Sequence, residues 1–188
     1  AQIYEETEEI ITSTVTAQVI ERKIEGIAWE DTNANGIKDE GESVLSNVEI
    51  TLTDEQGRQV TDVNGNIVTS VKTDENGAYV FEKLPKGKYY VKVSIPSSKY
   101  QLTDKEVGED SEINSKFDTE NKETDVITQL DYSNIPEITV SYVNAGLVKK
   151  PTKVIVNYKE EGTNTVLHDE ITIDGRIDDS YTTVDKID

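Results

Sequence analysis

A twelve-residue segment that begins at Asp31 carries the side chains with the clearest chemistry in this sequence. Oxygen-bearing side chains stand at its positions one, three, five, nine and twelve, namely Asp31, Asn33, Asn35, Asp39 and Glu42. Calcium takes about six to eight oxygen ligands, and loops with this spacing add the backbone carbonyl at position seven, which here belongs to Ile37. Gly36 stands at position six, where such a loop turns sharply. The spacing therefore predicts a Ca²⁺ site formed by these residues.

The segments that flank this loop, 26–29 and 48–53, are rich in strand-forming residues, so the loop is expected on a sheet. Without a pair of helices to open, we expect a structural ion and not a signalling switch. The alternative is an acidic surface loop that has this spacing by chance. A second group of oxygen-bearing residues has looser spacing, and we interpret it as a solvated loop, with a second calcium site as the alternative: Asp110, Glu112, Asn114 and Asp118.

The charge of the chain excludes several classes of function. Its 188 residues include 38 acidic and 19 basic side chains, for a formal net charge of −19. Such a surface repels phosphate backbones and anionic lipid headgroups, so we expect no nucleic-acid partner. No apolar run is long enough to span a bilayer, which predicts no membrane insertion. The chain begins at Ala1 without a methionine, and we expect it to be a piece of a longer protein.

Catalytic side chains are scarce in this sequence. The absence of cysteine excludes disulfides, thiol catalysis and cysteine-bound zinc. The single histidine, His168, would have to serve any Ser-His-Asp arrangement, yet its neighbours predict an exposed strand or turn. In so acidic a chain some pair of carboxylates will always lie at a separation suited to glycoside hydrolysis, so such a pair discriminates nothing. We predict that the protein is not an enzyme.

Alternating apolar and polar residues predict an all-β fold. Val48, Ile50 and Leu52 alternate with polar residues, which places one face of a strand on a core. The segment 88–95 repeats this pattern, and further strands are expected at 126–130, 137–143, 154–158 and through 171–173. Asn64-Gly65 and Asn76-Gly77 predict two tight hairpins, because Asn and Gly readily adopt positive φ. The polar stretch 103–124 predicts a long, partly ordered loop.

A change of composition at 149–152 predicts a boundary between modules, since Pro151 cannot continue a strand ladder and the local charge becomes positive. The predicted organisation is a connector or last strand of a preceding module at 1–25, a β-sandwich at 26–148, a linker at 149–152 and a second β unit at 153–188.

Several motifs resemble the SdrD B-like repeat. They are Gly26-Ile27-Ala28-Trp29-Glu30-Asp31 through Gly41-Glu42, Leu45-Ser46-Asn47-Val48, the run from Thr73 to Phe81, the run from Leu84 to Val91, Asp110 to Ser115, and Val143 to Leu147. The resemblance covers residues 26–148. It implies a prealbumin-like β-sandwich that binds calcium at the loop described above and is repeated as a stalk in surface adhesins of Gram-positive bacteria. Members of the family often carry Asp where this chain has Asn144, which implies a weaker accessory calcium contact.

The C-terminal part resembles the opening half of a mucin-binding-protein (MucBP) repeat, a small β-grasp domain. The resemblance is carried by the runs Lys153 to Tyr158, Ile171 to Gly175 and Ser180 to Thr183, whereas Asp178 stands where that family usually has a second glycine. It implies a partial β-grasp unit at the C-terminal end of the chain, incomplete within this sequence.

The two resemblances together imply a non-catalytic, calcium-stabilised stalk module that projects an adhesive region. The expected location is extracellular, on the bacterial cell wall, with peptidoglycan anchoring through an LPXTG-type signal outside this sequence. The expected partners are neighbouring repeats of the same chain, and the module itself is expected to be a monomer. The alternative is an adhesion module that binds host mucin glycans or host proteins directly through exposed Tyr or Trp side chains; packing within the core is the ordinary role of these aromatics.

Overall fold

A computed structural model describes residues 22–68, 70–110, 112–129 and 139–182. These residues contain no helix, and their strands are β1 (Arg22–Glu30), β2 (Glu49–Asp54), β3 (Val71–Lys72), β4 (Ala78–Phe81), β5 (Gly87–Ser94), β6 (Tyr100–Leu102), β7 (Ile127–Gln129), β8 (Thr139–Tyr142), β9 (Ala145–Lys149), β10 (Pro151–Lys159) and β11 (Val166–Arg176). The all-β prediction is therefore confirmed. No described segment forms a helix with the length and apolar character that crossing a membrane requires. Most of the predicted N-terminal connector, residues 1–21, lies outside the described residues.

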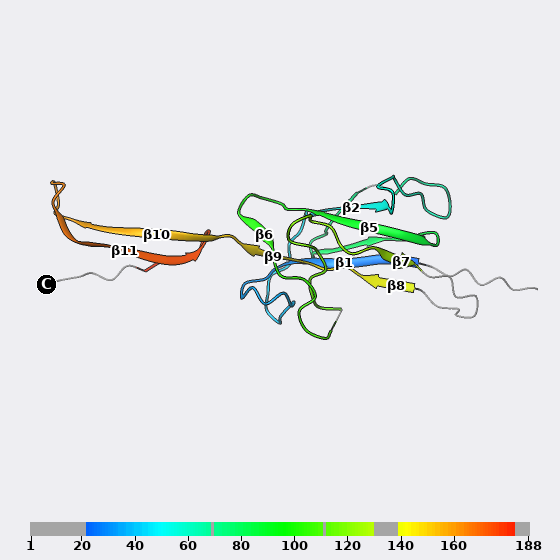
Figure 1. Ribbon diagram of the computed structural model, residues 1–188, viewed down its shortest axis with the longest axis horizontal. Coiled ribbons are helices and arrows are strands. Elements are labelled where there is room, and N and C mark those ends of the chain that lie inside the picture. Colours follow the sequence, from blue (N-terminus) through cyan, green and yellow to red (C-terminus); the bar gives the residue numbers. More distant parts are fainter. Residues whose placement is uncertain (1–21, 69, 111, 130–138, 183–188) are drawn as a thin grey trace, which may run out of the picture.

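Two sheets form a sandwich, and a separate hairpin extends from one end of it (Figure 1). The first sheet has the order β4-β1-β9-β6, and β8 also pairs with β1. The second sheet has the order β3-β2-β5-β7. In β2 and β5 the residues on one side are buried, namely Ile50, Leu52, Tyr89, Val91 and Val93, so the alternation in the sequence correctly gave the face that packs.

The core between the sheets is made of apolar side chains from both. Phe81, Leu84 and Phe117 are among its largest fully buried members. Burial of one such side chain stabilises a fold by roughly 1.5–3 kcal/mol. Tyr79 and Phe81 add an edge-to-face contact with ring centroids 5.8 Å apart. Phe117 shows that the polar stretch 103–124, although it forms no named strand, is packed against the sandwich and is not merely solvated.

The first and last strands of the sandwich run in the same direction. β1 pairs in parallel with β8 through residues 22–25 and with β9 through residues 28–30, on the same edge. Val143 marks the step between β8 and β9, where its amide donates to the carbonyl of Glu25 at 2.8 Å. Because β1 and β9 are parallel neighbours, the described chain enters the sandwich at one end and leaves it at the other.

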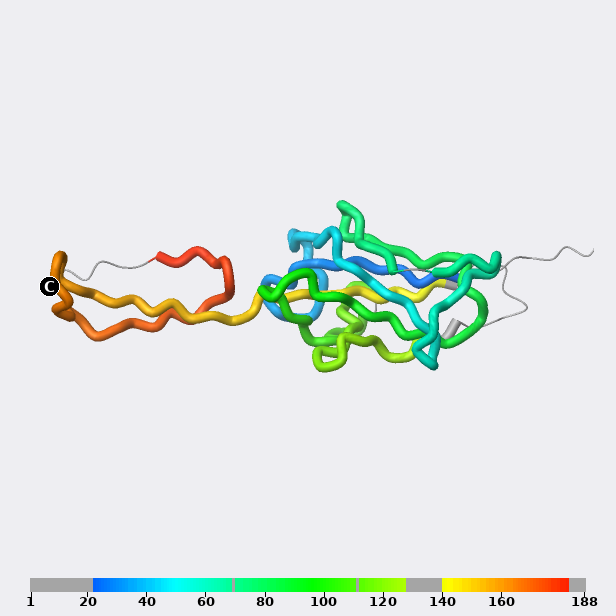
Figure 2. The backbone as a smooth tube through the Cα atoms, turned by 90° about the horizontal axis from the view of Figure 1, so that it is seen from above, coloured from blue at the N-terminus to red at the C-terminus, as the bar shows by residue number. Residues whose placement is uncertain are grey.

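The hairpin of β10 and β11 continues from β9 along the long axis of the molecule (Figures 1 and 2). Its strands are antiparallel, and Val154 pairs with Ile173 and Val156 with Ile171. Only Lys150 separates β9 from β10, so strands occupy most of the predicted linker 149–152. Pro151 is the first residue of β10, a position at which a proline leaves no ladder bond unmade.

The two Asn-Gly turns have different roles. Gly65 has a positive φ of 83°, and Thr61 bridges to Ile67 across this turn in antiparallel fashion, so the first predicted hairpin is confirmed. The second prediction is wrong in its pairing. Gly77 closes a turn on Asp74, but β3 pairs with β2 and β4 pairs with β1, so the turn carries the chain from one sheet to the other.

Candidate metal centre

The predicted calcium loop leaves the end of β1 and is anchored at both of its ends to the first sheet. The amide of Asp31 donates to the carbonyl of Leu147 in β9 at 2.8 Å, which continues the pairing of β1 and β9 by one residue. On the return side, Val44 bridges to Trp29 and the amide of Leu45 donates to the carbonyl of Ala28 at 2.8 Å. The loop is thus held on a sheet, as its flanks predict.

Asp31 is fully buried and organises the first half of the loop. Its Oδ2 accepts hydrogen bonds from the amide of Gly36 at 2.8 Å and from the hydroxyl of Thr103 at 2.5 Å. Its Oδ1 accepts one from the amide of Asn35 at 3.2 Å. A buried carboxylate is costly unless hydrogen bonds or a cation compensate it, and these donors supply part of that compensation.

The side chains at positions three, five and nine meet one another. The amide nitrogens of Asn33 and Asn35 both donate to Oδ2 of Asp39, each at 2.7 Å. The side-chain oxygens of the two asparagines accept bonds from the backbone, Asn33 from the amide of Asn35 and Asn35 from the amide of Ile37. The two asparagine side chains therefore present nitrogen to Asp39, and binding a cation there requires that their oxygens turn toward it.

Glu42 closes the loop. Its Oε1 accepts a bond from the amide of Thr32 at 2.7 Å, and its Oε2 accepts one from the amide of Asp39 at 3.1 Å. Lys38 also crosses the loop, since its ammonium group donates to the carbonyls of Asp39 and Glu42. The twelfth position of the loop is thereby brought next to the second and the ninth.

The loop geometry requires a glycine at position six, where Gly36 stands. Its φ is +77°, and a Cβ atom there would lie 2.6 Å from the carbonyl oxygen of Asp104 and 2.9 Å from Cγ2 of Val107. Both the conformation and the close approach of the loop that follows Thr103 exclude a larger residue. Gly41 also has a positive φ, of +89°, but nothing lies within 4 Å of a Cβ atom there.

The chemistry of the donor set suits a hard divalent cation. It comprises the carboxylates of Asp31, Asp39 and Glu42, the side-chain amides of Asn33 and Asn35, and the carbonyl of Ile37. Oxygen donors of this kind are those that Ca²⁺ prefers. Within the described ranges, no three carboxylate, histidine or cysteine side chains gather in the manner of a metal site. In the structure, the side-chain amides of Asn33 and Asn35 contact Asp39. The carboxylates of Asp31 and Glu42 accept hydrogen bonds from backbone amides of the loop.

Two residues that contact this loop could not be found from its spacing. Thr103 bonds to Asp31 across 72 positions of sequence. Asn114 forms an antiparallel bridge with Ile37, and its buried Oδ1 has no hydrogen-bond partner within the described part of the chain. Among the other members of the second oxygen-rich group, the carboxylates of Asp110 and Asp118 accept bonds from backbone amides of their own turns.

Asn144 ties β1 to the long loop. It is 2% exposed, its Oδ1 accepts a bond from the amide of Ile27 at 3.1 Å, and its Nδ2 donates to the carbonyl of Glu112 at 2.7 Å. An amide that uses both its donor and its acceptor in this way has a structural function that an aspartate could not fully replace.

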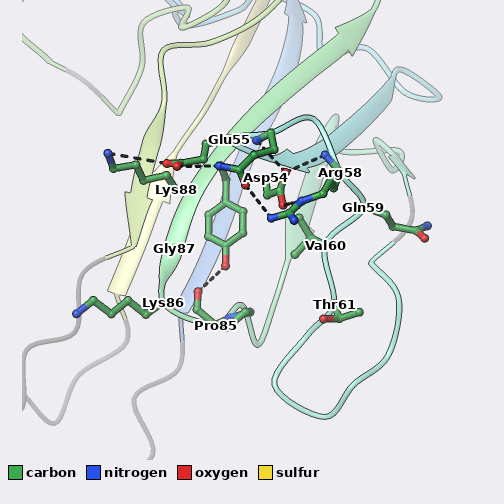
Figure 3. A pocket seen from close by; sticks show the side chains of 12 residues that line it. Asp54, Glu55, Arg58, Gln59, Val60, Thr61, Pro85, Lys86, Gly87 and Lys88 are labelled. Carbon is green, nitrogen blue, oxygen red and sulfur yellow. Dashed lines mark hydrogen bonds and ion pairs between the residues drawn. The ribbon is translucent and has the colours of Figure 1, made fainter.

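A surface cavity of 520 Å³ lies at the opposite end of the sandwich, between the segments 54–61 and 85–89 (Figure 3). Its charged groups pair with one another, Asp54 with Arg58 at 2.7 Å and Glu55 with Lys88 at 3.9 Å. Burial opposes the shift, but hydrogen bonds from Arg58 and Gln56 hold the pKa of Asp54 below its usual value. A general acid at neutral pH needs the opposite shift, so Asp54 is not poised for that role.

Comparison with known proteins identifies the sandwich. The SdrD B-like domain family matches residues 22–142. Serine-aspartate repeat-containing protein D of Staphylococcus aureus (strain Newman) is 36% identical over 136 residues, which is 72% of this chain and 9% of that protein. Serine-aspartate repeat-containing protein F of Staphylococcus epidermidis (strain ATCC 12228 / FDA PCI 1200) is 41% identical over 75 residues, which is 40% of this chain and 4% of that protein. The chain thus spans less than a tenth of these relatives.

Among solved structures, the minor pilin GBS52 of Streptococcus agalactiae has a TM-score of 0.44 and 18% identity, and the match covers 71% of this chain and 46% of the pilin. The family match spans β1 to β8 and includes the whole of the calcium-type loop. The chain belongs to the SdrD B-like domain family.

Proposed function

We propose that this chain is a non-catalytic structural module, a stalk unit stabilised by calcium that spaces a more distant adhesive region from the cell surface. The observation that carries the proposal is the parallel pairing of β1 and β9. A module that the chain enters at one end and leaves at the other adds length when it is repeated. A module whose two ends lie together would add little.

Family membership supports the same function. The relatives are long staphylococcal proteins of which this chain matches less than a tenth, and the position of such a domain within a longer chain fits a repeated unit whose partners are its neighbours. We infer an extracellular location on the Gram-positive cell wall. The paired charges of the cavity in Figure 3 fit a module without catalytic chemistry.

Calcium binding at the loop is the chemical part of the proposal. Asp31, Asn33, Asn35, Asp39 and Glu42 would provide side-chain oxygens, and Ile37 its carbonyl. Three of these six groups already meet, because Asn33 and Asn35 share the same oxygen of Asp39. Bound at this end of the sandwich, the ion would join the loop to the first sheet through the buried Asp31.

Thermal unfolding of the full chain tests calcium binding. With free calcium about a hundredfold above its dissociation constant, the ion adds about 2.7 kcal/mol to the free energy of unfolding. We expect a clear rise in Tm in millimolar calcium relative to excess chelator, and we expect Glu42→Gln to abolish that rise. Glu40→Gln is the matched control, because Glu40 is an exposed carboxylate of the same loop outside the ligand set. An equal shift in both variants, or none in the parent, would remove calcium from the proposal.

For the C-terminal hairpin we propose that β10 and β11 open a MucBP-like unit. Asp178 adopts a φ of 66°, a conformation that glycine favours, at the position where that family usually carries a glycine. Direct adhesion is tested by applying the full chain to an array of mucin glycans. Specific, saturable binding would replace the stalk function with an adhesive one, whereas its absence alongside a calcium-dependent Tm favours the stalk.

A further inference from the structure

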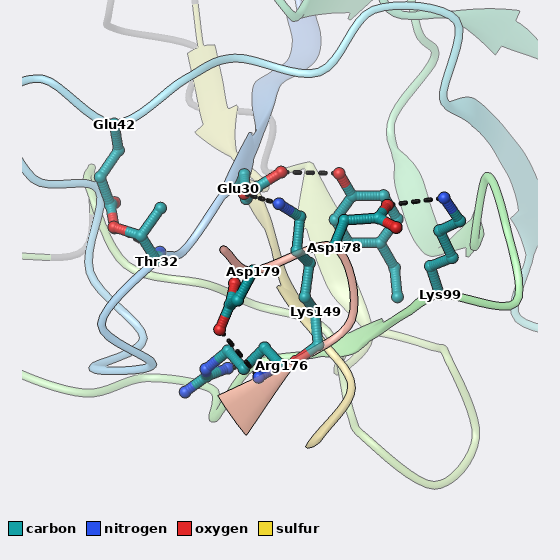
Figure 4. Close-up of polar contacts among 9 residues, drawn as sticks. Glu30, Thr32, Glu42, Lys99, Lys149, Arg176, Asp178 and Asp179 are labelled. Carbon is teal, nitrogen blue, oxygen red and sulfur yellow. Dashed lines mark hydrogen bonds and ion pairs between the residues drawn. The ribbon is translucent and has the colours of Figure 1, made fainter. Parts of the chain in front are cut away.

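The end of the sandwich from which β9 departs carries a cluster of polar contacts. The carboxylate of Glu30, the last residue of β1, contacts side chains of two other strands (Figure 4). Tyr100 of β6 donates its hydroxyl to Oε2 at 2.6 Å, and the ammonium group of Lys149 in β9 lies 3.2 Å from Oε1. The side chains of Glu30 and Lys149 are 18% and 24% exposed, so this pair is partly shielded from solvent. Burial, with a contribution from Glu30, raises the pKa of Tyr100 to about 12. These contacts fix the rim of the first sheet.

The base of the hairpin is tied to that rim through its backbone. The amide of Lys150 donates to the carbonyl of Lys99 at 2.8 Å, and the amide of Ile177 donates to the carbonyl of Lys150 at 3.1 Å. The Arg176 guanidinium donates to the carbonyl of Lys149 at 3.2 Å. Both strands of the hairpin are therefore connected to the sandwich, β10 by the chain itself and β11 by Arg176, while Ile177 binds the linking residue Lys150.

The segment that follows β11 adds a contact between side chains. Asp178 lies 2.6 Å from the Lys99 ammonium, and this interaction lowers the pKa of Asp178 below its usual value. The position of this segment is set by Tyr181, which donates its hydroxyl to the carbonyl of Arg176 at 2.9 Å. The ring of Tyr181 lies against Gly175, where a Cβ atom would approach the hydroxyl to 2.5 Å.

The calcium-type loop faces the same junction. A small cavity of 50 Å³ is lined from the sandwich side by Glu30, Asp31, Thr32 and Lys149 and from the hairpin side by Arg176 and Asp179. The first residues of the loop and the base of the hairpin thus share one interface.

We propose that this end of the sandwich is a docking surface for the module that begins at Pro151, and that its contacts hold the two modules in one orientation instead of letting them swivel at Lys150. We call the set Glu30, Lys99, Tyr100, Lys149, Arg176 and Asp178 the joint. An exposed pair such as Lys99 and Asp178 contributes little alone. The joint gains its rigidity from the combination of the backbone acceptors of Lys99 and Lys149 with the Lys99–Asp178 pair, on a rim that Glu30 fixes within the first sheet. The inference rests on the proposed stalk function, because a rigid joint is what keeps a stalk extended.

Distance measurement between two spin labels tests the joint. The chain has no cysteine, so the full chain with Glu75→Cys on the sandwich and Asn157→Cys on β10 carries only two labels, both at exposed positions. We expect one narrow distance distribution. Arg176→Ala combined with Asp178→Ala leaves the sandwich untouched and should roughly double the width, because it removes both side-chain contacts from the hairpin to the sandwich, and motion between domains is the ordinary behaviour without such contacts. The matched control is Lys153→Ala with Asp174→Ala, which removes an ion pair within the hairpin and should leave the width unchanged.

Lys99→Ala, which changes only the sandwich side, should broaden the distribution in the same direction but by less than the double variant, because it removes only the exposed pair with Asp178. A broad distribution in the parent, or an unchanged one in both joint variants, would overturn the proposal. The outcome is independent of the calcium test. A narrow distribution without a calcium-dependent Tm refutes calcium binding alone, and a broad distribution with a calcium-dependent Tm refutes the joint alone.

Discussion

Replacing Gly36 and Gly41 by alanine separates two requirements of the calcium-type loop. Both glycines have positive φ, so each substitution forces a left-handed conformation on an L-residue, at roughly 1–2 kcal/mol. Only at Gly36 does the new Cβ atom also meet other atoms, because the carbonyl oxygen of Asp104 would lie 2.6 Å away. Overpacking of this kind costs a further 1–3 kcal/mol, roughly. We therefore expect Gly36→Ala to destabilise the fold by about 2–5 kcal/mol and Gly41→Ala by about 1–2 kcal/mol.

Urea unfolding of the full chain, in excess chelator so that metal affinity plays no part, measures both free energies. The dependence of the unfolding free energy on urea should be the same in the two variants and the parent, since the surface exposed on unfolding does not change. Equal destabilisation by the two substitutions would refute the close approach between Gly36 and the segment that contains Asp104. A larger effect of Gly41→Ala would contradict the geometry of the loop itself.

Three further predictions follow from buried or shifted groups. Phe117→Ala should cost about 3–5 kcal/mol in urea unfolding, because Phe117 is fully buried although it lies in a polar loop; a cost below about 1 kcal/mol would mean that this loop is not packed. Tyr100 should titrate in the folded protein with a pKa near 12, measured by ultraviolet absorption. Because this folded pKa is raised, the contribution of Tyr100 to stability is present below the unfolded pKa of about 10 and is lost as the pH rises toward 12. Glu30→Gln should lower the pKa of Tyr100. Asn144→Asp should destabilise the fold by about 1–3 kcal/mol, because it removes the donor to Glu112 while the acceptor for the amide of Ile27 remains. An unchanged midpoint of urea unfolding would show that the side-chain amide of Asn144 is not needed.

The local sequence pattern was sufficient to predict the core-facing residues of the strands and the conformation of the turn glycines. Alternation in β2 and β5 identified which residues face the core, since side chains on a strand point to opposite faces with a period of two. The positive φ of Gly65 and Gly77 was likewise implied by turn chemistry. Turn chemistry does not specify which strands pair, and for that reason Asn76-Gly77 was wrongly expected to close a hairpin when it links the two sheets.

Contacts between distant segments could not be read from the sequence. The hydroxyl that Thr103 donates to Asp31 and the bridge between Asn114 and Ile37 depend on how the segment 103–124 lies on the sandwich. That segment is polar, and its sequence predicts a partly ordered loop. Its buried residues, Phe117 and Ser115 among them, are buried by contacts with distant parts of the sandwich and not by a local periodic pattern. The contacts of the joint are of the same kind, since Lys99 and Asp178 are 79 positions apart.

The calcium-type loop and the joint are mechanically connected through β1 and β9. Glu30 belongs to the joint and Asp31 to the loop, and the Asp31 amide bonds to Leu147, two residues before Lys149. A substitution that displaces the start of the loop must therefore disturb the strand from which the hairpin departs. We expect Gly36→Ala, through its effect on Asp31, to broaden the distance distribution between labels at positions 75 and 157, whereas Gly41→Ala should not. If both substitutions leave the distribution narrow while Arg176→Ala with Asp178→Ala broadens it, the joint is independent of the loop and its own contacts set the orientation of the hairpin.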